Sequence, residues 1–299
     1  MGLAVNILEE GLIYGIMTMG VYITYRILDF PDLSVDGTFP LGCCVTGALI
    51  LAGVPPWLTC VIVFFVGMAA GCVTGLLHVK LGITDLLSGI IVMTGLLSIN
   101  LVVTGNKSIL AFYNETTIFS GPLAKSLPPG LYRYRVLIIV FLTALAVKLL
   151  IDFFFKTKTG LLLRATGDNN QFVTTALARD PGKMKILGLA LGNGCTALAG
   201  GVLAQQAGSA STATGAGMVV QALASVIIGT NVFRRVRFMQ PTTMVLLGSI
   251  AYKACLTIAI RLNLPTQYLK LLMAVLFVVV LVTNRYSSRE GRPRFAKDN

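Results

Sequence analysis

The sequence predicts an all-α, polytopic membrane protein with about 8–10 transmembrane segments, because helices satisfy their own backbone hydrogen bonds in lipid. Of its 299 residues, 55% are hydrophobic and only 12% are charged, whereas soluble domains carry about 25% charged residues. The mean hydropathy is +0.82. The chain also holds 31 glycines, a residue that is more frequent in membrane helices than in soluble ones. This composition excludes a soluble enzyme, a disordered chain and a disulfide scaffold.

Nine apolar segments carry the prediction, since about 20 apolar residues cross about 30 Å of hydrocarbon. They are 5–26, 37–53, 57–79, 84–104, 134–155, 185–206, 217–233, 239–261 and 267–284. The segments 37–53 and 217–233 are short. We expect broken or re-entrant helices there, which are tolerated only where they face protein or a water-filled cavity. No soluble domain is appended, so residues 1–299 are expected to form a single transmembrane domain.

The distribution of charge predicts the orientation. Lys and Arg number 24 against 12 Asp and Glu, a net charge of +12, and basic residues collect in cytoplasmic loops. The stretch 156–185, the cluster at 234–237 and the tail 285–299 are basic. We therefore expect them in the cytoplasm, with the N-terminus and the loop 105–133 outside. The basic residues follow apolar runs and form no separate domain, so we expect a lipid bilayer around the chain and no nucleic acid partner.

The sequence offers no catalytic motif. It lacks the G-x-x-x-x-G-K-[ST] nucleotide-binding pattern and the H-E-x-x-H zinc pattern, and its one histidine, His78, stands at the end of an apolar segment. Its six cysteines lie in apolar runs without C-x-x-C spacing, which is typical of small buried side chains. We expect no catalytic residue, no metal and no cofactor. Any ATP hydrolysis would belong to a separate partner subunit.

The basic stretch 156–185 contains a predicted short helix. Asp168 and Asn169 are good helix N-caps, and residues 170–179 carry an apolar stripe that includes Phe172. The sequence Asp-Pro-Gly at 180–182 then ends the helix. Two interpretations stay open: the stripe packs on the underside of the membrane domain, or it is a docking surface for another protein.

Four polar residues lie in the break between the first two segments, at Asp29, Asp32, Ser34 and Asp36. A charged residue costs about 2.5 to 3.5 kcal/mol at the bilayer centre, so each acid must be solvated, paired or capping a helix. One interpretation is that Asp36 or Ser34 caps the second helix. The other places this interrupted element beside the substrate path, where helix ends and unwound backbone bind polar groups.

Polar residues also mark two later segments and one break. Asp85 opens the segment 84–104, where the helix dipole favours an acid. Lys253 lies well inside 239–261, and either extends its amine to the interface or faces a cavity. The stretch 208–217 separates two segments with small polar residues, which suits a re-entrant turn near a translocation path.

The order of four motifs along nearly the whole chain resembles the membrane subunits of branched-chain amino-acid-type ABC importers. The central motif is Lys-Thr-Gly-Leu-Leu-Leu-Arg-Ala-Thr-Gly-Asp-Asn at 158–169, and Leu-Gly-Asn-Gly-Cys-Thr-Ala-Leu-Ala-Gly-Gly follows at 191–201. Gly-Ala-Gly at 215–217 with Ile-Ile-Gly-Thr at 227–230, and Ile-Leu-Asp-Phe at 27–30 with Asp-Gly at 36–37, complete the pattern. The stretch 31–37 departs from the members that carry aliphatic amino acids and is closer to a branch associated with aromatic or other amino acids.

This resemblance implies a type II-like permease in a bacterial inner membrane, with a cytoplasmic C-terminus. It implies a homodimer that binds ABC ATPase subunits through a cytoplasmic coupling helix and an extracytoplasmic substrate-binding protein on its outer face. The expected ATPase-coupling residues are Gly160, Arg164, Ala165, Gly167, Asp168, Asn169 and Phe172. The candidate residues of the substrate pathway are Asp32, Ser34, Asp36, Asp85, Asn193 and Lys253.

An alternative function is kept open by the acids and the lysine in or beside the apolar segments. Asp32, Asp36, Asp85 or Lys253 could serve an ion-coupled secondary transporter, because intramembrane ionisable residues are default candidates for ion pathways. Transport by the isolated chain under an ion gradient alone would separate this alternative from an ATP-driven permease.

Overall fold

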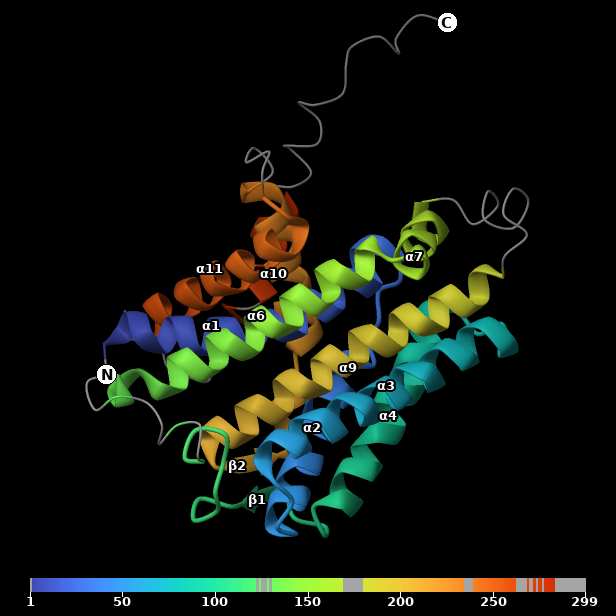
Figure 1. The fold of residues 1–299 in the computed structure, drawn as a ribbon. Coiled ribbons are helices and arrows are strands. Elements are labelled where there is room, and N and C mark those ends of the chain that lie inside the picture. Colours follow the sequence, from blue (N-terminus) through green and yellow to red (C-terminus); the bar gives the residue numbers. More distant parts are fainter. Residues whose placement is uncertain are drawn as a thin grey trace, which may run out of the picture.

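The computed structural model describes residues 2–121, 131–168, 180–233 and 239–261, together with 124, 128, 268, 271–272, 274–275 and 277–282. The first half of the chain is a run of helices (Figure 1). They are α1 Leu3–Val21, the π-helix η1 Tyr22–Ile27, α2 Val35–Leu51, α3 Pro56–Leu81 and α4 Asp85–Val103. The π-helix continues α1 without a break, and a non-helical link at 28–34 then leads into α2.

The second half of the chain is also mostly helical and contains two short strands. Its elements are β1 Ile109–Ala111, the 3-10 helix η2 Tyr132–Tyr134, α6 Arg135–Lys156, α7 Lys158–Asp168, α9 Pro181–Ala207, β2 Ser209–Ser211, the 3-10 helix η3 Thr212–Gly215, α10 Met218–Val232 and α11 Pro241–Arg261. The strands β1 and β2 pair antiparallel, with Leu110 opposite Ala210. Residues 271–272, 274–275 and 277–282 are also helical.

The predicted all-α, polytopic membrane fold is confirmed. Among the described residues, six helices are long and apolar enough to span a membrane: α3, α4, η2 with α6, α9, η3 with α10, and α11. The helix α1 contains Glu9 and Glu10 and falls outside that set. The two segments expected to be incomplete spans are short helices here, since α2 has 17 residues and α10 has 15.

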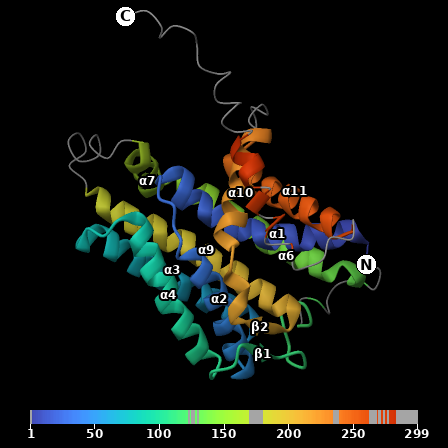
Figure 2. The ribbon, with the colours of Figure 1, turned by 180° about the vertical axis from the view of Figure 1, so that it is seen from behind.

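The helix α9 is the centre of the bundle (Figure 1). Of its most apolar window, 72% is buried, the largest share among the six spans. The helices α3, α2 and α1 pack against it. Figure 2 shows α10 and α11 beside α1, on the far side of α9 from α4.

Glycines allow α3 to approach α9 backbone to backbone. A Cβ atom at Gly67 would overlap the main chain of Asn193, and one at Gly71 would overlap the carbonyl oxygen of Leu189. Gly75 meets Ile186 in the same way. Small residues at every fourth position are the device by which membrane helices pack closely. The seam between α3 and α9 therefore has no room for a side chain at these positions.

The two ends of the bundle differ in character. The basic end is where η1, α3 and α6 finish and α9 begins, and α7 lies there (Figure 1). Its basic residues are Arg26, Lys80, Lys156, Lys158, Arg164, Lys183 and Lys185. The sheet end is where α9 finishes and β1 pairs with β2. The sequence predicts that the basic end is cytoplasmic.

Candidate functional site

Three side chains from distant parts of the chain form a closed hydrogen-bonded ring inside the bundle. The backbone N–H of Ser34 donates to Oδ1 of Asp32 (2.9 Å), and Oγ of Ser34 donates to Oδ1 of Asn193 (3.1 Å). Nδ2 of Asn193 donates to Oδ2 of Asp32 (2.7 Å). Only 4% of Asp32 is exposed, and Ser34 and Asn193 are fully buried. The ring therefore fixes the link 28–34 to the middle of α9.

Asp36 connects the first turn of α2 to the beginning of α10. Its Oδ1 accepts from the backbone N–H of Val219 (2.8 Å), and its Oδ2 accepts from that of Gly217 (3.2 Å). The first N–H groups of a helix have no partner within the helix, and the positive end of the helix dipole attracts a carboxylate. Asp36 thus caps α10, while Ser34, the N-cap of α2, makes no capping bond with its side chain.

The four residues Asp32, Ser34, Asp36 and Asn193 are named here the polar centre. Because Asn193 lies midway along α9, the polar centre lies midway across the bundle. Both short helices begin there: α2 at Val35 and α10 at Met218. The structure therefore brings four of the six predicted pathway residues together, and it places them where two helices start inside the membrane.

The stretch 208–217 forms the turn that lets α10 begin inside the bundle. Residues 209–211 pair with β1, and η3 then returns the chain toward α2. A Cβ atom at Gly215 would overlap the carbonyl oxygen of Asp36, and Gly217 adopts a left-handed backbone conformation with φ of +89°. Glycine is the residue that adopts such a conformation without steric cost. The small residues are thus required by the close approach of η3 to α2.

The other two predicted pathway residues lie elsewhere. Asp85 is in the first turn of α4 at the basic end, with Oδ1 3.0 Å from Nδ1 of His78. Lys253 forms an ion pair with Glu10 of α1, and its Nζ is 5.2 Å from the centroid of the Tyr14 ring. Within the part of the chain that the structure describes, neither one forms a hydrogen bond or an ion pair with the polar centre. The sequence analysis did not predict either pairing.

The predicted coupling segment is partly described, and its first part is the helix α7. Gly160, Arg164, Ala165 and Gly167 lie in α7, and Asp168 is its last residue. Asn169, Phe172, the predicted helix 170–179, the basic cluster 234–237 and the tail 285–299 lie outside the described residues. The sequence analysis treated 158–168 as the approach to a helix, and the structure shows that this approach is helical itself.

Two glycines fix α7 against the basic end of the bundle. A Cβ atom at Gly160 would overlap the carbonyl oxygen of Phe154, and one at Gly167 would overlap that of Ile27 in η1. Leu163 is fully buried between them. Arg164 is exposed, with its guanidinium carbon 4.5 Å from the centroid of the Phe155 ring. The helix α7 is therefore held against α6 and η1, with the exposed Arg164 at the edge of this contact.

Comparison with known proteins decides the family. A family described as "Branched-chain amino acid transport system / permease component" matches residues 3–281. The chain belongs to this permease family. Its membership confirms the resemblance predicted from the four motifs, and it makes the chain a multi-pass membrane protein of amino-acid transport.

Relatives of this permease carry transport names. A "Tyrosine transport system permease protein" of Clostridioides difficile is 36% identical over 279 residues, which cover 93% of this chain and 90% of the relative. An "Autoinducer 2 import system permease protein LsrC" of Yersinia enterocolitica is 29% identical over 198 residues, covering 66% of this chain and 52% of the relative. No solved structure matches the permease significantly. The relatives are transport permeases, which agrees with a transport subunit.

Proposed function

We propose that this permease forms the translocation pathway of an ATP-driven importer for an amino acid or a similar small polar solute. The observation that carries the proposal is the polar centre, where α2 and α10 both begin beside Asp36 in the middle of the bundle. Discontinuous helices whose ends meet near the midplane form the substrate sites of many transporters. The polar centre places carboxylate, amide and hydroxyl groups midway across the bundle.

The substrate class rests on the relatives and on the family. The Clostridioides difficile relative is named a tyrosine permease, and it aligns with almost the whole of this chain. An amino acid is therefore the first solute to test, and tyrosine is the first amino acid. Delivery by an extracytoplasmic binding protein at the sheet end completes the proposed system.

The energy source is proposed to be a partner ATPase that binds at the basic end. The sequence lacks the nucleotide-binding pattern that ATP hydrolysis by a P-loop requires. The helix α7 is fixed to α6 and η1 through Gly160 and Gly167, with Arg164 exposed. Residues 156–185, which include α7, form the proposed coupling segment, and the tail 285–299 is proposed to be on the same cytoplasmic side.

The proposed assembly is a homodimer of permeases with two ATPase subunits in a bacterial inner membrane. Its mechanism follows from the route between α7 and the polar centre. Gly167 of α7 touches Ile27 of η1, and the link 28–34 continues from η1 to Asp32 and Ser34. A displacement of α7 by the ATPase would therefore reach the polar centre through one continuous stretch of main chain.

Reconstitution in lipid vesicles tests the proposal. The permease is incorporated alone, or with an ABC ATPase and a substrate-binding protein from the same organism, and uptake of radiolabelled tyrosine and a panel of other amino acids is measured. We expect uptake only with ATP and all partners present, and no ATP hydrolysis by the permease alone. Uptake by the permease alone under a proton or sodium gradient would contradict the proposal and restore the ion-coupled alternative.

A further inference from the structure

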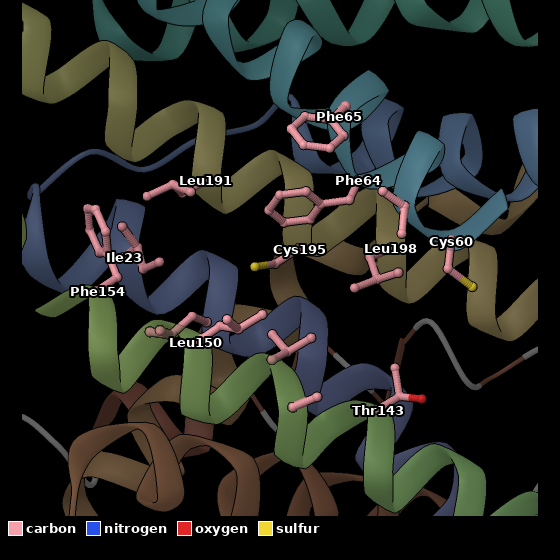
Figure 3. A pocket seen from close by; sticks show the side chains of 14 residues that line it. Ile23, Cys60, Phe64, Phe65, Thr143, Leu150, Phe154, Leu191, Cys195 and Leu198 are labelled. Atoms are coloured by element: carbon pink, nitrogen blue, oxygen red, sulfur yellow. The ribbon is translucent and has the colours of Figure 1, made fainter. Parts of the chain in front are cut away.

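An apolar cavity of about 450 Å³ lies between α3, α6 and α9 (Figure 3). We name it the slot. It forms because α6 packs mainly against α1 and leaves a gap toward α9. Phe64 of α3, Leu150 and Phe154 of α6, and Leu191 and Cys195 of α9 are among the side chains that line it.

The walls of the slot cannot bind a polar solute. Thr143 is one of its few polar side chains, and its Oγ1 donates to the carbonyl oxygen of Ile139 (2.8 Å). The thiol sulfur of Cys60 accepts from Nε2 of Gln205 (3.3 Å). A polar molecule in the slot would lose its hydrogen bonds to water without replacement. The slot is therefore separate from the solute pathway proposed above.

The slot opens toward the bilayer. At its rim, Phe65 is 61% exposed and Leu150 is 68% exposed, and all three surrounding helices are long and apolar enough to span the membrane. The medium at this rim is lipid hydrocarbon. An empty cavity deprives its lining of dispersion contacts, so a chain of methylene groups from the bilayer is the occupant that stabilises it.

One end of the slot adjoins exposed positive charge. Ile23 of η1 and Phe154 of α6 line the slot near the basic end. Arg26 is exposed three residues after Ile23, and Arg164 lies over the ring of Phe155, which follows Phe154. Both guanidinium groups are close enough to Tyr22 to interact with it electrostatically. Arginine binds phosphate through paired, charge-assisted hydrogen bonds.

We propose that the slot is a binding site for an anionic phospholipid. One acyl chain lies between α3, α6 and α9, and the phosphate lies at Arg26 and Arg164. The charge at one end of an otherwise apolar cavity distinguishes this occupant from a neutral lipid, since each arginine near a membrane surface favours an anionic headgroup by about fivefold.

A single-tryptophan reporter tests this site. The chain has one tryptophan, Trp57, which is 62% exposed. In the full chain, Trp57→Phe combined with Phe64→Trp places the only indole in the wall of the slot. The protein is reconstituted in phosphatidylcholine vesicles containing small amounts of phosphatidylglycerol or phosphatidylcholine with brominated acyl chains, and quenching of the fluorescence is measured. Phe65→Trp on the rim is the second reporter if Phe64→Trp prevents folding.

The expected result is that brominated phosphatidylglycerol reaches half-maximal quenching at a mole fraction about 25-fold lower than brominated phosphatidylcholine does, since the two arginines each contribute about fivefold. Arg26→Gln reduces this preference to about fivefold. Arg261→Gln, an exposed arginine at the end of α11, leaves it unchanged. Equal quenching by the two lipids would show that the slot samples bulk lipid without selection, and no quenching by either would show that protein covers it. Both results overturn the proposal.

Discussion

The two sides of α9 are built in opposite ways. On the tight side, α3 meets α9 through Gly67, Gly71 and Gly75, with main chain against main chain, and the polar centre lies at the same level. On the open side, α6 stands away from α9 and leaves the slot. Small residues thus bring the helices into close contact on the tight side, and large apolar residues face lipid on the open side. The comparison indicates that the tight side holds the polar centre, the proposed solute site, in a fixed position.

The largest effect is expected from a side chain placed in the seam of the tight side. Gly71→Leu pushes a side chain into the main chain of Leu189, and overpacking costs typically about 1–3 kcal/mol even where side chains can move. We expect the yield of folded protein in detergent to collapse, as measured by fluorescence-detected size-exclusion chromatography and thermal unfolding. The control is Gly95→Leu in α4, where a Cβ atom meets nothing within 4 Å. Equal melting temperatures for the two variants would contradict the account of the seam.

The second-largest effect is expected from a substitution in the polar centre, which lies on the tight side. Asp36→Ala leaves the N–H groups of Gly217 and Val219 without their acceptor, and loss of an N-cap costs about 0.5–2 kcal/mol. We expect the variant to insert in the membrane but to lose uptake in reconstituted vesicles, because α10 no longer begins at a fixed point.

Asp36→Asn sharpens the same test, since the amide oxygen still accepts a hydrogen bond while the charge is gone. Uptake retained in part by Asp36→Asn supports a capping role. Loss of uptake as complete as with Asp36→Ala would show that the charge itself is needed and would favour the ion-coupled alternative.

Arg164 tests whether the ATPase acts on this bundle through α7. Arg164→Glu reverses the exposed charge of α7 and removes its contact with the Phe155 ring. In the complete complex we expect ATP hydrolysis to continue while uptake of the labelled solute falls, with membrane insertion intact. Arg261→Glu, at the end of α11, is the matched control and should keep both activities. Normal coupling in well-folded Arg164→Glu would show that α7 is not the docking point.

The smallest effect is expected on the open side. Leu150→Ala removes a side chain that is 68% exposed at the rim of the slot, and surface substitutions of this kind change stability by less than about 0.5 kcal/mol. The same substitution at Leu189, fully buried on the tight side, creates a cavity and costs about 2–5 kcal/mol. Melting temperatures of the two variants give the contrast directly. A similar loss in both would erase the distinction between the two sides.

Composition and charge-free stretches predicted nine segments, and six of them coincide with the six described helices that can span a membrane, because a bilayer imposes a fixed length and a fixed polarity on each crossing. The shortness of the helices α2 and α10 was also predictable, since Asp36 and the small polar stretch 208–217 interrupt apolar runs. Those signals are local in the sequence, and the physical constraint behind them is local too.

Pairing between distant residues was not predictable in the same way. Asp32 and Asn193 are 161 positions apart, and nothing in either neighbourhood specifies the other. Lys253 was indistinguishable from a pathway residue until the fold brought Glu10 beside it. The helical state of α7 was missed because the segment contains Gly160 and Gly167, and glycine has a low helix propensity. The π-helix η1 was missed because it has no sequence signature.

The π-helix at the end of α1 gives the molecule a point of adjustable register. A π-helical turn holds one residue more than an α-helical turn and is rare outside functional sites. Because α7 touches Ile27 without an intervening side chain, a shift of α7 cannot be absorbed by rotamer changes at that contact. Conversion of Tyr22–Ile27 between π and α geometry would rotate the chain that follows and draw Ser34 along the surface of α9. A displacement of α7 at the basic end would thereby become a rotation of the chain at the polar centre.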